Sequence, residues 1–396
     1  MAGEGGRLRV VAHNGARIWG GGEIAMCRIL AAVADRGHEV RLFCNDEGVA
    51  ARAASFGFPV GVLRLGGDAV LTDALRFARE LRRLAPDALL VGTFRKLFLA
   101  GLAGRLAGVP RVVARIGLST DMPRNGKYRF AFRHFIDGVA LNAEGLRSSF
   151  LAALPGYDAS KVVTIYMGIE PPARRFPDGE VRRALGIGEG VAVVGAVARL
   201  DVQKRFDRLL RALTALPEGV HCVLAGDGPE RHTLERQARE LGLEGRVHFL
   251  GWREDVGDVL AALDVFVVCS DREGMANAML EAMAVGVPVV STPVSGAAEA
   301  LGPGPDGIPA GVLVDREGEG LAAALRELLG DPALRRAMGE EGRRRVADRF
   351  GVERMAERWE AFLGGDVARA TSGGLERARR GSAGVGEGTG SAGRRP

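Results

Sequence analysis

The sequence predicts an α/β protein built from two doubly wound domains. Three observations lead to this prediction. Short apolar, β-branched runs alternate with segments of helical spacing along most of the chain. The first two strand-like runs begin about 30 residues apart, as a parallel crossover through a helix requires. The chain of 396 residues is too long for one ordinary core, so we expect two domains, residues 1–172 and 173–349.

The first domain begins with a strand at Leu8–His13, and a glycine-rich turn, residues 14–23, leads from it into a helix. Backbone N–H groups of such a turn can hold phosphates, although the Gly-x-Gly-x-x-Gly spacing of a dinucleotide site is not cleanly present. The alternation then continues to the end of the domain. We expect helices at 24–34, 72–83 and 97–107, strands at 37–43, 88–91, 111–116 and 139–144, and a last segment at 162–170.

Two arginines of this domain fall at predicted strand ends. Arg95 follows the strand at 88–91, and Arg115 belongs to the end of the strand at 111–116. Ligands of open parallel sheets bind beyond the carboxyl ends of the strands. We therefore take both arginines as candidates that face the cleft.

A basic and aromatic stretch, Pro123–Asp137, is open to three interpretations. On a helix, Phe132, Phe135 and Ile136 would share one face, with arginines on a neighbouring polar face. The helix could lie on an anionic bilayer, dock on the domain as an ordinary amphipathic helix, which we favour, or bind RNA. No RNA-binding motif or basic low-complexity arm accompanies the stretch, so we expect no nucleic-acid partner.

The second domain follows a linker at Pro171–Arg175 and opens with an apolar strand at 190–198. Arg199 and Lys204 stand at the junction of this strand with the next helix, where they could meet a diphosphate or remain two solvated loop cations. Later elements repeat the alternation. We expect strands at 220–225, 247–251, 264–268, 287–291 and 311–314, and helices at 234–241, 321–329, 332–338 and 350–363.

The unit between the strands 264–268 and 287–291 carries the most informative pattern. Its loop contains Glu273 and Gly274, and its helix begins near Asn277 and contains Glu281. Gly274 permits close approach of a ligand, and the free N–H groups of the first helical turn favour an anion. Two carboxylates beside an anion site require hydroxyl partners, such as a sugar and a ribose diol. The alternative is an ordinary loop-to-helix junction.

The spacing Glu273, Gly274, six further residues and Glu281, continued by Ala282–Val290, resembles the retaining glycosyltransferases of family 4. The resemblance implies the GT-B fold, in which two Rossmann-like domains face each other across a cleft. It implies that Glu273 faces the donor sugar as a catalytic residue, and that Glu281 holds the ribose hydroxyls. It also matches Arg199 and Lys204 to the phosphate-binding pair of the family, which stabilises the charge on the leaving diphosphate.

The resemblance implies further donor contacts. Gly21 and Gly22 match the Gly-Gly near the donor phosphates, Leu250 belongs to the strand that flanks the nucleotide base, and backbone N–H groups after Gly274 approach the diphosphate. The residues that supply those groups are Met275, Ala276 and Asn277. Two departures are visible. Many relatives carry a His near Gly117 that contacts the donor sugar and is absent here, and an Asn-Gly-Ile-Asp pattern is replaced by Met167–Glu170.

The resemblance therefore implies transfer of a sugar, with retention, from a UDP- or GDP-linked donor to a glycan, lipid-linked or lipopolysaccharide-type acceptor. The acceptor would enter from the first domain, where Arg95 and Arg115 are the candidates. No Asp-x-Asp clamp occurs in a suitable place, so we expect no metal and no cofactor besides the donor. The alternatives are a nucleotide-sugar epimerase of the same fold and a non-catalytic nucleotide-sugar-binding protein.

Composition and charge add expectations about location. Hydrophobic residues make up 47%, yet no apolar run of spanning length or signal core appears, so we expect a cytoplasmic protein. Residues 1–175 carry 25 Lys and Arg against 15 Asp and Glu, and the remainder carries 29 against 34. This basic half raises the possibility that the protein binds peripherally to an anionic membrane surface, on the inner face of the membrane. We also expect four reduced core cysteines, a helix 350–363 that returns to the first domain, and a disordered tail, 364–396.

Overall fold

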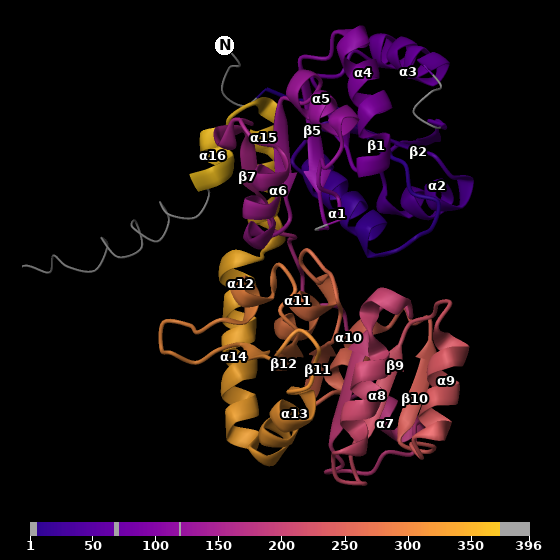
Figure 1. Ribbon diagram of the computed structural model, residues 1–396, viewed down its shortest axis with the longest axis vertical. Coiled ribbons are helices and arrows are strands. Elements are labelled where there is room, and N and C mark those ends of the chain that lie inside the picture. The colour runs from indigo at the N-terminus through magenta and orange to yellow at the C-terminus, as the bar shows by residue number, and fades with distance from the viewer. Residues whose placement is uncertain (1–5, 67–70, 119, 373–396) are drawn as a thin grey trace, which may run out of the picture.

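The computed structural model describes residues 6–66, 71–118 and 120–372. Two parallel sheets with their helices form two α/β domains, which Figure 1 shows one above the other. The long apolar runs that predicted strands are buried: Leu89 and Leu90, for example, are 0% exposed. The predicted fold class is confirmed.

The first domain contains a seven-stranded sheet in the order β3-β2-β1-β4-β5-β6-β7, and its strand pairs are parallel. Its strands are β1 (Arg9–Asn14), β2 (Glu39–Cys44), β3 (Val60–Val62), β4 (Ala88–Val91), β5 (Arg111–Ile116), β6 (Gly138–Leu141) and β7 (Val162–Thr164). Its helices are α1 (Gly21–Asp35), α2 (Glu47–Ala53), α3 (Leu71–Leu84), α4 (Leu97–Ala107), α5 (Gly126–His134) and α6 (Arg147–Ala153). The sequence analysis missed α2 and β3, which are short.

The second domain contains a six-stranded parallel sheet in the order β10-β9-β8-β11-β12-β13. Its strands are β8 (Val193–Val197), β9 (His221–Ala225), β10 (Val247–Gly251), β11 (Val265–Val268), β12 (Val289–Ser291) and β13 (Gly311–Leu313). Its helices are α7 (Glu180–Ala184), α8 (Phe206–Thr214), α9 (Arg231–Glu240), α10 (Val256–Ala261), α11 (Asn277–Ala284), α12 (Ala297–Leu301), α13 (Leu321–Gly330) and α14 (Pro332–Arg349).

Each sheet has one point at which the strand order reverses. In the first sheet it lies between β1 and β4, and in the second between β8 and β11. The loops that leave the carboxyl ends of such neighbouring strands diverge to opposite faces, and the crevice between them is where open α/β sheets bind ligands. The topology alone therefore points to two loop pairs, one in each domain.

Helix α14 differs from the sequence prediction, which ended it at Met338. The helix continues to Arg349 through Gly339 and Gly342. Gly339 serves close packing: a Cβ there would lie 2.1 Å from the carbonyl oxygen of Gly286, which follows α11. The absence of a side chain at Gly339 is thus required by a neighbouring turn.

Helix α15 (Val352–Gly364) packs against α1 of the first domain, as Figure 1 shows at the left of the molecule. Trp359 is buried, and Arg36, the C-cap residue of α1, donates to Glu360 at 2.6 Å. Helix α16 (Val367–Ser372) follows, so the prediction of disorder from residue 364 was wrong for these residues. The rest of the predicted tail, 373–396, lies outside the described residues.

Helix α5 docks on the first domain, as in the interpretation of Pro123–Asp137 that we favoured. Phe132 and Ile136 are buried, and Arg129 donates to the Pro123 and Ala153 carbonyl oxygens at 3.2 and 3.1 Å. Phe130 is 49% exposed. Of the aromatic residues in this stretch, Phe132 is buried in the core, while Tyr128 and Phe135 are partly buried.

Within the described ranges, no helix combines the length and the apolar character that crossing a bilayer requires. The four cysteines are unbridged and buried, as predicted.

Candidate functional site

A cavity of about 550 Å³ lies between the two domains, where the loops from both strand-order reversals meet. The second domain contributes the loops after β8 and β11, and the first contributes those after β1, β4 and β5. The cavity thus combines the two crevices that the topology indicates. Of the residues proposed from the sequence, those that line it are Gly21, Gly22, Arg95, Arg115, Arg199, Lys204, Glu273, Gly274, Met275, Ala276 and Asn277.

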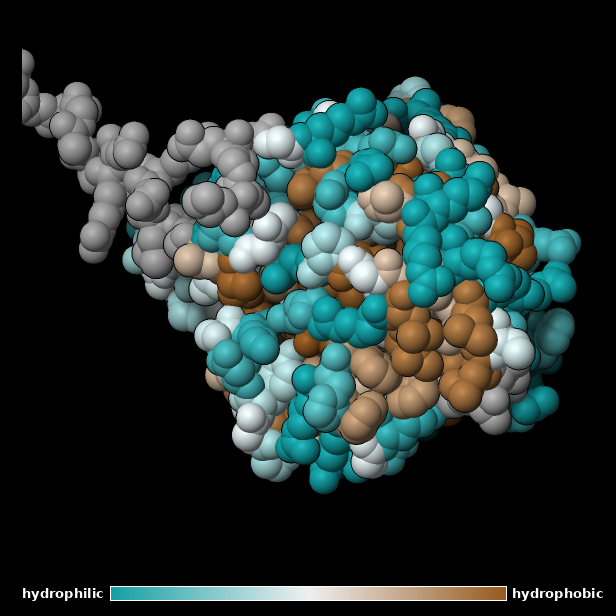
Figure 2. All heavy atoms as spheres, turned by 90° about the horizontal axis from the view of Figure 1, so that it is seen from above, coloured by the Kyte–Doolittle hydropathy of each residue, from teal (hydrophilic) through white to brown (hydrophobic). Residues whose placement is uncertain are grey.

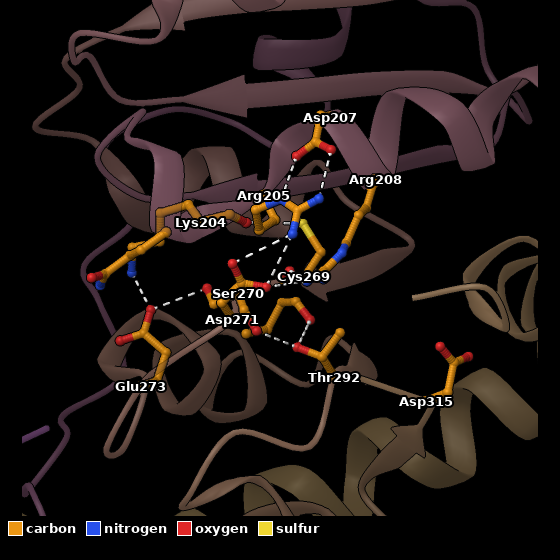
Figure 3. Close-up of polar contacts among 12 residues, drawn as sticks. Lys204, Arg205, Asp207, Arg208, Cys269, Ser270, Asp271, Glu273, Thr292 and Asp315 are labelled. Atoms are coloured by element: carbon orange, nitrogen blue, oxygen red, sulfur yellow. Dashed lines mark hydrogen bonds and ion pairs between the residues drawn. The ribbon is translucent and has the colours of Figure 1, made fainter. Parts of the chain in front are cut away.

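Two cations of the second domain face this cavity. Arg199 is exposed, and its guanidinium has no hydrogen bond or salt bridge with the described residues. The Lys204 ammonium pairs with Glu273 Oε1, which also accepts from Ser270 Oγ at 3.2 Å (Figure 3). The side chains of Lys204 and Glu273 are 19% and 11% exposed. One cation is therefore free for an anion, and a second is held beside a carboxylate.

The backbone next to Lys204 contains a strained residue. A short 3-10 turn, Val202–Lys204, is capped by Asp201, whose carboxylate accepts from Gln203 N at 3.1 Å. Arg205 then adopts a left-handed conformation with φ of 53°. Such a conformation costs a residue other than glycine about 1 kcal/mol, so the surroundings must hold it in place.

Ion pairs supply that hold. Arg205 donates to Asp207 at 2.9 and 3.1 Å and to Asp271 at 3.2 Å. Arg208, which is buried, pairs with Asp271 at 2.8 Å and donates to the Cys269 carbonyl oxygen at 3.1 Å. Figure 3 shows these side chains to the right of Lys204 and Glu273. The network ties the turn that carries Lys204 to the loop that carries Glu273.

The turn at Gly274 makes contact with the first domain. A Cβ at Gly274 would lie 2.1 Å from the Gly117 carbonyl oxygen and 2.3 Å from Asn142 Oδ1. The Gly274 carbonyl oxygen accepts from Gly296 N at 2.7 Å, which fixes the turn within its own domain. Helix α11 begins directly after this turn without a side-chain cap, so first-turn N–H groups are available near the cavity.

Two residues proposed from the sequence do not line the cavity. Glu281 of α11 pairs instead with Arg28 of α1 at 2.8 Å. Leu250 is half-buried in β10, which is the edge strand of its sheet, two strands away from β8. Glu281 thus lies on the helix whose first turn lines the cavity, whereas Leu250 lies on a strand that does not reach the cavity wall.

The first-domain wall carries the two predicted arginines. Arg95 is exposed, and neither its side chain nor that of Arg115 makes a hydrogen bond or salt bridge with the described residues. Burial lowers the pKa of Arg115, and the nearby carboxylates of Glu23 and Asp121 oppose that effect. The Arg115 guanidinium lies beside Gly117, where a Cβ would be 3.7 Å from Nη1.

Sequence reasoning missed three residues of this wall. Burial raises the pKa of the Glu23 and Asp121 carboxyl groups, and Asn142 Oδ1 is buried without a hydrogen-bond partner among the described residues. Asn142 directly follows β6, so the strand-end rule that found Arg95 would have found it as well. Glu23 is the acidic residue in the first turn of α1, while Asp121 has no local signal in the sequence.

Metal binding and thiol chemistry are two other possibilities at such a site. In the described part of the chain, no group of three His, Cys, Asp or Glu residues is arranged to hold a metal ion. Cys269 lines the cavity, but burial raises the pKa of its thiol to about 12, so it is protonated at neutral pH. A thiol in that state is a poor nucleophile.

Sequence comparison assigns the chain to a family. The profile described as Glycosyltransferase Family 4 matches residues 19–171, and the profile described as Glycosyl transferases group 1 matches residues 178–345. Together they cover both domains. The protein belongs to the family 4 glycosyltransferases.

Individual relatives agree with this assignment. The chain is 41% identical over 140 residues to the lipopolysaccharide core biosynthesis glycosyltransferase LpsE of Rhizobium meliloti. The matched residues cover 35% of this chain and 40% of that relative. The chain thus spans about two fifths of LpsE. A GDP-mannose-dependent alpha-(1-6)-phosphatidylinositol dimannoside mannosyltransferase of Mycobacterium tuberculosis is 29% identical over 340 residues, 79% of this chain and 85% of the relative.

Solved structures identify the fold. The crystal structure of HepE of Anabaena in complex with UDP-glucose matches this chain with a TM-score of 0.78 and 23% identity. The match covers 90% of this chain and 99% of the HepE chain. WaaG, a glycosyltransferase involved in lipopolysaccharide biosynthesis, has a TM-score of 0.67 and 22% identity, with coverages of 90% and 100%. At these identities the likeness establishes the fold, which is GT-B. The epimerase and non-catalytic alternatives are not favoured, since these relatives are glycosyltransferases.

Proposed function

We propose that this protein is a retaining glycosyltransferase that moves a sugar from a nucleotide diphosphate sugar to a glycan, lipid-linked or lipopolysaccharide-type acceptor. One observation carries the proposal. Arg199, Lys204 and the Glu273–Gly274 turn come from separate loops of the second domain and line one cavity with the first domain. This is the set of groups that departure of a diphosphate from a sugar requires.

The cations would act on the leaving group. A glycosyl–phosphate bond breaks only when the charge that grows on the diphosphate is stabilised. Arg199, which has no protein partner among the described residues, would bind the diphosphate through its planar fork. Lys204 would supply a second charge, shared between the phosphate and Glu273. The first-turn N–H groups of α11 and of α1, at Gly21 and Gly22, would add dipoles that favour an anion.

The carboxylates would hold hydroxyl groups. Glu273 is 9% exposed and its Oε1 is already bonded to Lys204 and Ser270, so its position is fixed. We propose that it orients the donor sugar. Glu281, just beyond the cavity wall, would accept from the ribose hydroxyls, and the nucleotide base would extend toward Leu250.

The first domain would receive the acceptor. Arg95 and Arg115 line its side of the cavity and have no hydrogen bond or salt bridge among the described residues, which leaves their guanidinium groups available for polar groups of a substrate. Arg115 lies beside Gly117, where many relatives carry a His. It would supply the polar contact that the missing imidazole makes elsewhere.

Two experiments test the reaction. The protein would be incubated with UDP- and GDP-linked sugars and with saccharide and lipid-linked acceptors, and the anomeric configuration of the product would be read by NMR. Retention is expected, and an inverted product would refute the proposed mechanism. The transferase activity should survive EDTA, because Arg199 and Lys204 would take the place of a metal ion. If EDTA abolishes the activity and a divalent ion restores it, metal independence is refuted.

A peripheral position on the inner face of an anionic membrane forms a further part of the proposal. Apolar residues gather on the surface that Figure 2 views, which belongs to the first domain. On α3, Leu71 and Leu75 are 55% and 53% exposed next to the exposed arginines Arg76 and Arg79. Such a surface suits anionic lipid. In flotation at low salt, the wild-type protein should bind anionic vesicles, and the double variant Leu71→Ser/Leu75→Ser should not. Equal vesicle binding by the wild type and the double variant would exclude this surface as the membrane contact.

A further inference from the structure

Helices α1 and α11, which belong to different domains, are joined by an ion pair. Arg28 Nη1 lies 2.8 Å from Glu281 Oε1, and the two side chains are 39% and 13% exposed. Among the described residues, this is the one ion pair within 4 Å that connects residues 6–171 with residues 172–349. No motif in the sequence relates Arg28 to Glu281, which is 253 positions away.

We propose that Arg28 is a positioning residue that holds the Glu281 carboxylate for the ribose hydroxyls, so that nucleotide recognition by the second domain requires a cation from the first. The inference rests on the proposed function, in which Glu281 binds the ribose. It adds a residue of the opposite domain to the donor site and gives that residue a defined task.

The burial of Glu281 makes a partner necessary. A carboxylate that is 13% exposed has lost most of its water, and an unpaired ion in such a place is costly. Arg28 is its only hydrogen-bonding or ion-pair partner among the described side chains, and it occupies Oε1. A carboxylate has about four acceptor positions on its two oxygens, so Oε2 can still accept from a diol.

The ion pair also fixes the geometry of the side chain. The residues next to Glu281 in α11, Leu280 and Ala282, are fully buried, so the backbone position of Glu281 is set by core packing. The side-chain torsions are what remains free, and ordering a Glu side chain costs about 1–2 kcal/mol. Because Arg28 orders this side chain before the nucleotide arrives, binding does not have to provide that free energy.

The location of Arg28 links recognition to domain position. Arg28 reaches Glu281 only where α1 and α11 approach, and the same approach brings Gly274 against Gly117. The Glu273 carboxylate differs in this respect, because its cation, Lys204, belongs to its own domain. Sugar orientation is therefore prepared within the second domain, whereas ribose recognition is completed by the first.

The test compares ribonucleotide and deoxyribonucleotide binding. Calorimetry would measure the dissociation constants of UDP and 2′-deoxy-UDP, or of GDP and 2′-deoxy-GDP if guanine nucleotide binds more tightly. A hydrogen bond from the 2′-hydroxyl to a positioned carboxylate predicts a preference of about tenfold for the ribonucleotide. In Arg28→Met we expect this preference to fall to about threefold or less, and in Arg28→Lys to be intermediate.

Arg36, the C-cap residue of the same helix, offers a control. It pairs with Glu360 and Glu353 of α15, away from the cavity, so Arg36→Met removes a comparable link of α1. It should keep the wild-type preference. If Arg28 merely joined the domains, Arg28→Met would lower the melting temperature and leave the preference unchanged, which would overturn the inference.

Glu281→Gln separates this inference from the proposed function. If Glu281→Gln abolishes the ribonucleotide preference and Arg28→Met does not, the donor site stands and the role of Arg28 is rejected. If Glu281→Gln also keeps the full preference, Glu281 does not bind ribose, and the proposed donor arrangement fails together with the inference.

Discussion

Gly274 of the second domain packs so tightly against Gly117 of the first that a Cβ at residue 274 would lie 2.1 Å from the Gly117 carbonyl oxygen. Asn142 Oδ1 would be equally crowded, at 2.3 Å. The absence of a side chain at residue 274 is therefore a condition for the two domains to meet beside the cavity. The loop that carries Glu273 reaches the first domain through this contact.

Substitution Gly274→Ala should disrupt this arrangement. The new methyl group must push the loops apart by about 1 Å, and a displacement of that size in a site can cost about 100-fold in rate. We expect kcat/KM to fall by about that factor. Gly219→Ala is the control, because a Cβ there meets nothing within 4 Å. Wild-type kcat/KM in Gly274→Ala would show that this contact is not needed.

Substitution Lys204→Met should lower kcat by about 100- to 1,000-fold, because it removes a charge that we assign to the leaving diphosphate. It should also lower stability by about 3 kcal/mol, since Glu273 would stay buried without its cation. The measurements are steady-state kinetics and urea unfolding. Lys161→Met, at an exposed lysine outside the cavity, should change neither.

The double variant Lys204→Met/Glu273→Gln separates the two effects of Lys204. A neutral amide no longer needs a buried counter-ion, so most of the lost stability should return. Activity should stay low, because both proposed functional groups are missing. Recovery of activity together with stability would mean that Lys204 acts only on folding.

Several second-domain residues that the sequence singles out line the cavity. Arg199 and Glu273 each follow an apolar run, and the rule that ligands lie beyond parallel strand ends brings such positions together. The structure places both on one cavity because β8 and β11 are neighbours at the reversal of strand order. Local sequence patterns are enough to predict such site residues when the rule for parallel strand ends implies that they lie close together in space.

Contacts between distant segments escaped prediction for the opposite reason. Asp121 lies in a loop without a repeating pattern, and the pair of Arg28 with Glu281 depends on how two domains meet. The predicted end of α14 at Met338 was wrong, because the helix continues through Gly339, whose small size serves packing against Gly286. Each of these features is defined by a partner far away in the chain, which local propensity does not contain.

Substitution Asp271→Asn tests the network behind the site. The change weakens the ion pairs that Asp271 makes with Arg205 and with the buried Arg208. We expect kcat to fall about tenfold, because the turn that carries Lys204 would lose its tie to the Glu273 loop. Asp315→Asn is the control: Figure 3 shows Asp315 apart from the network, and its carboxylate bonds only nearby backbone N–H groups. Unchanged kcat in Asp271→Asn would contradict the positioning role.

The buried His13 predicts a pH dependence of stability. Burial lowers its pKa to about 4 in the folded protein, while the unfolded chain keeps a value near 6.5. Between these values the unfolded state binds the proton more strongly, so the free energy of unfolding should decrease by about 2 kcal/mol from about pH 7.5 to about pH 5. In urea unfolding experiments, the stability of His13→Gln should not show this decrease of about 2 kcal/mol between the two pH values.

His232→Gln provides the comparison for that experiment, because the His232 side chain is 93% exposed. It should show the same change of stability with pH as the wild type. If His13→Gln also shows the wild-type change, the imidazole of His13 is not held neutral by burial.

The most direct test of the donor site is a crystal structure with bound UDP or GDP. The account predicts that the β-phosphate lies within hydrogen-bond distance of Arg199 and Lys204 and close to the Gly274 turn, with the ribose hydroxyls on Glu281. A nucleotide bound elsewhere, or one whose phosphates point away from both cations, would contradict the account.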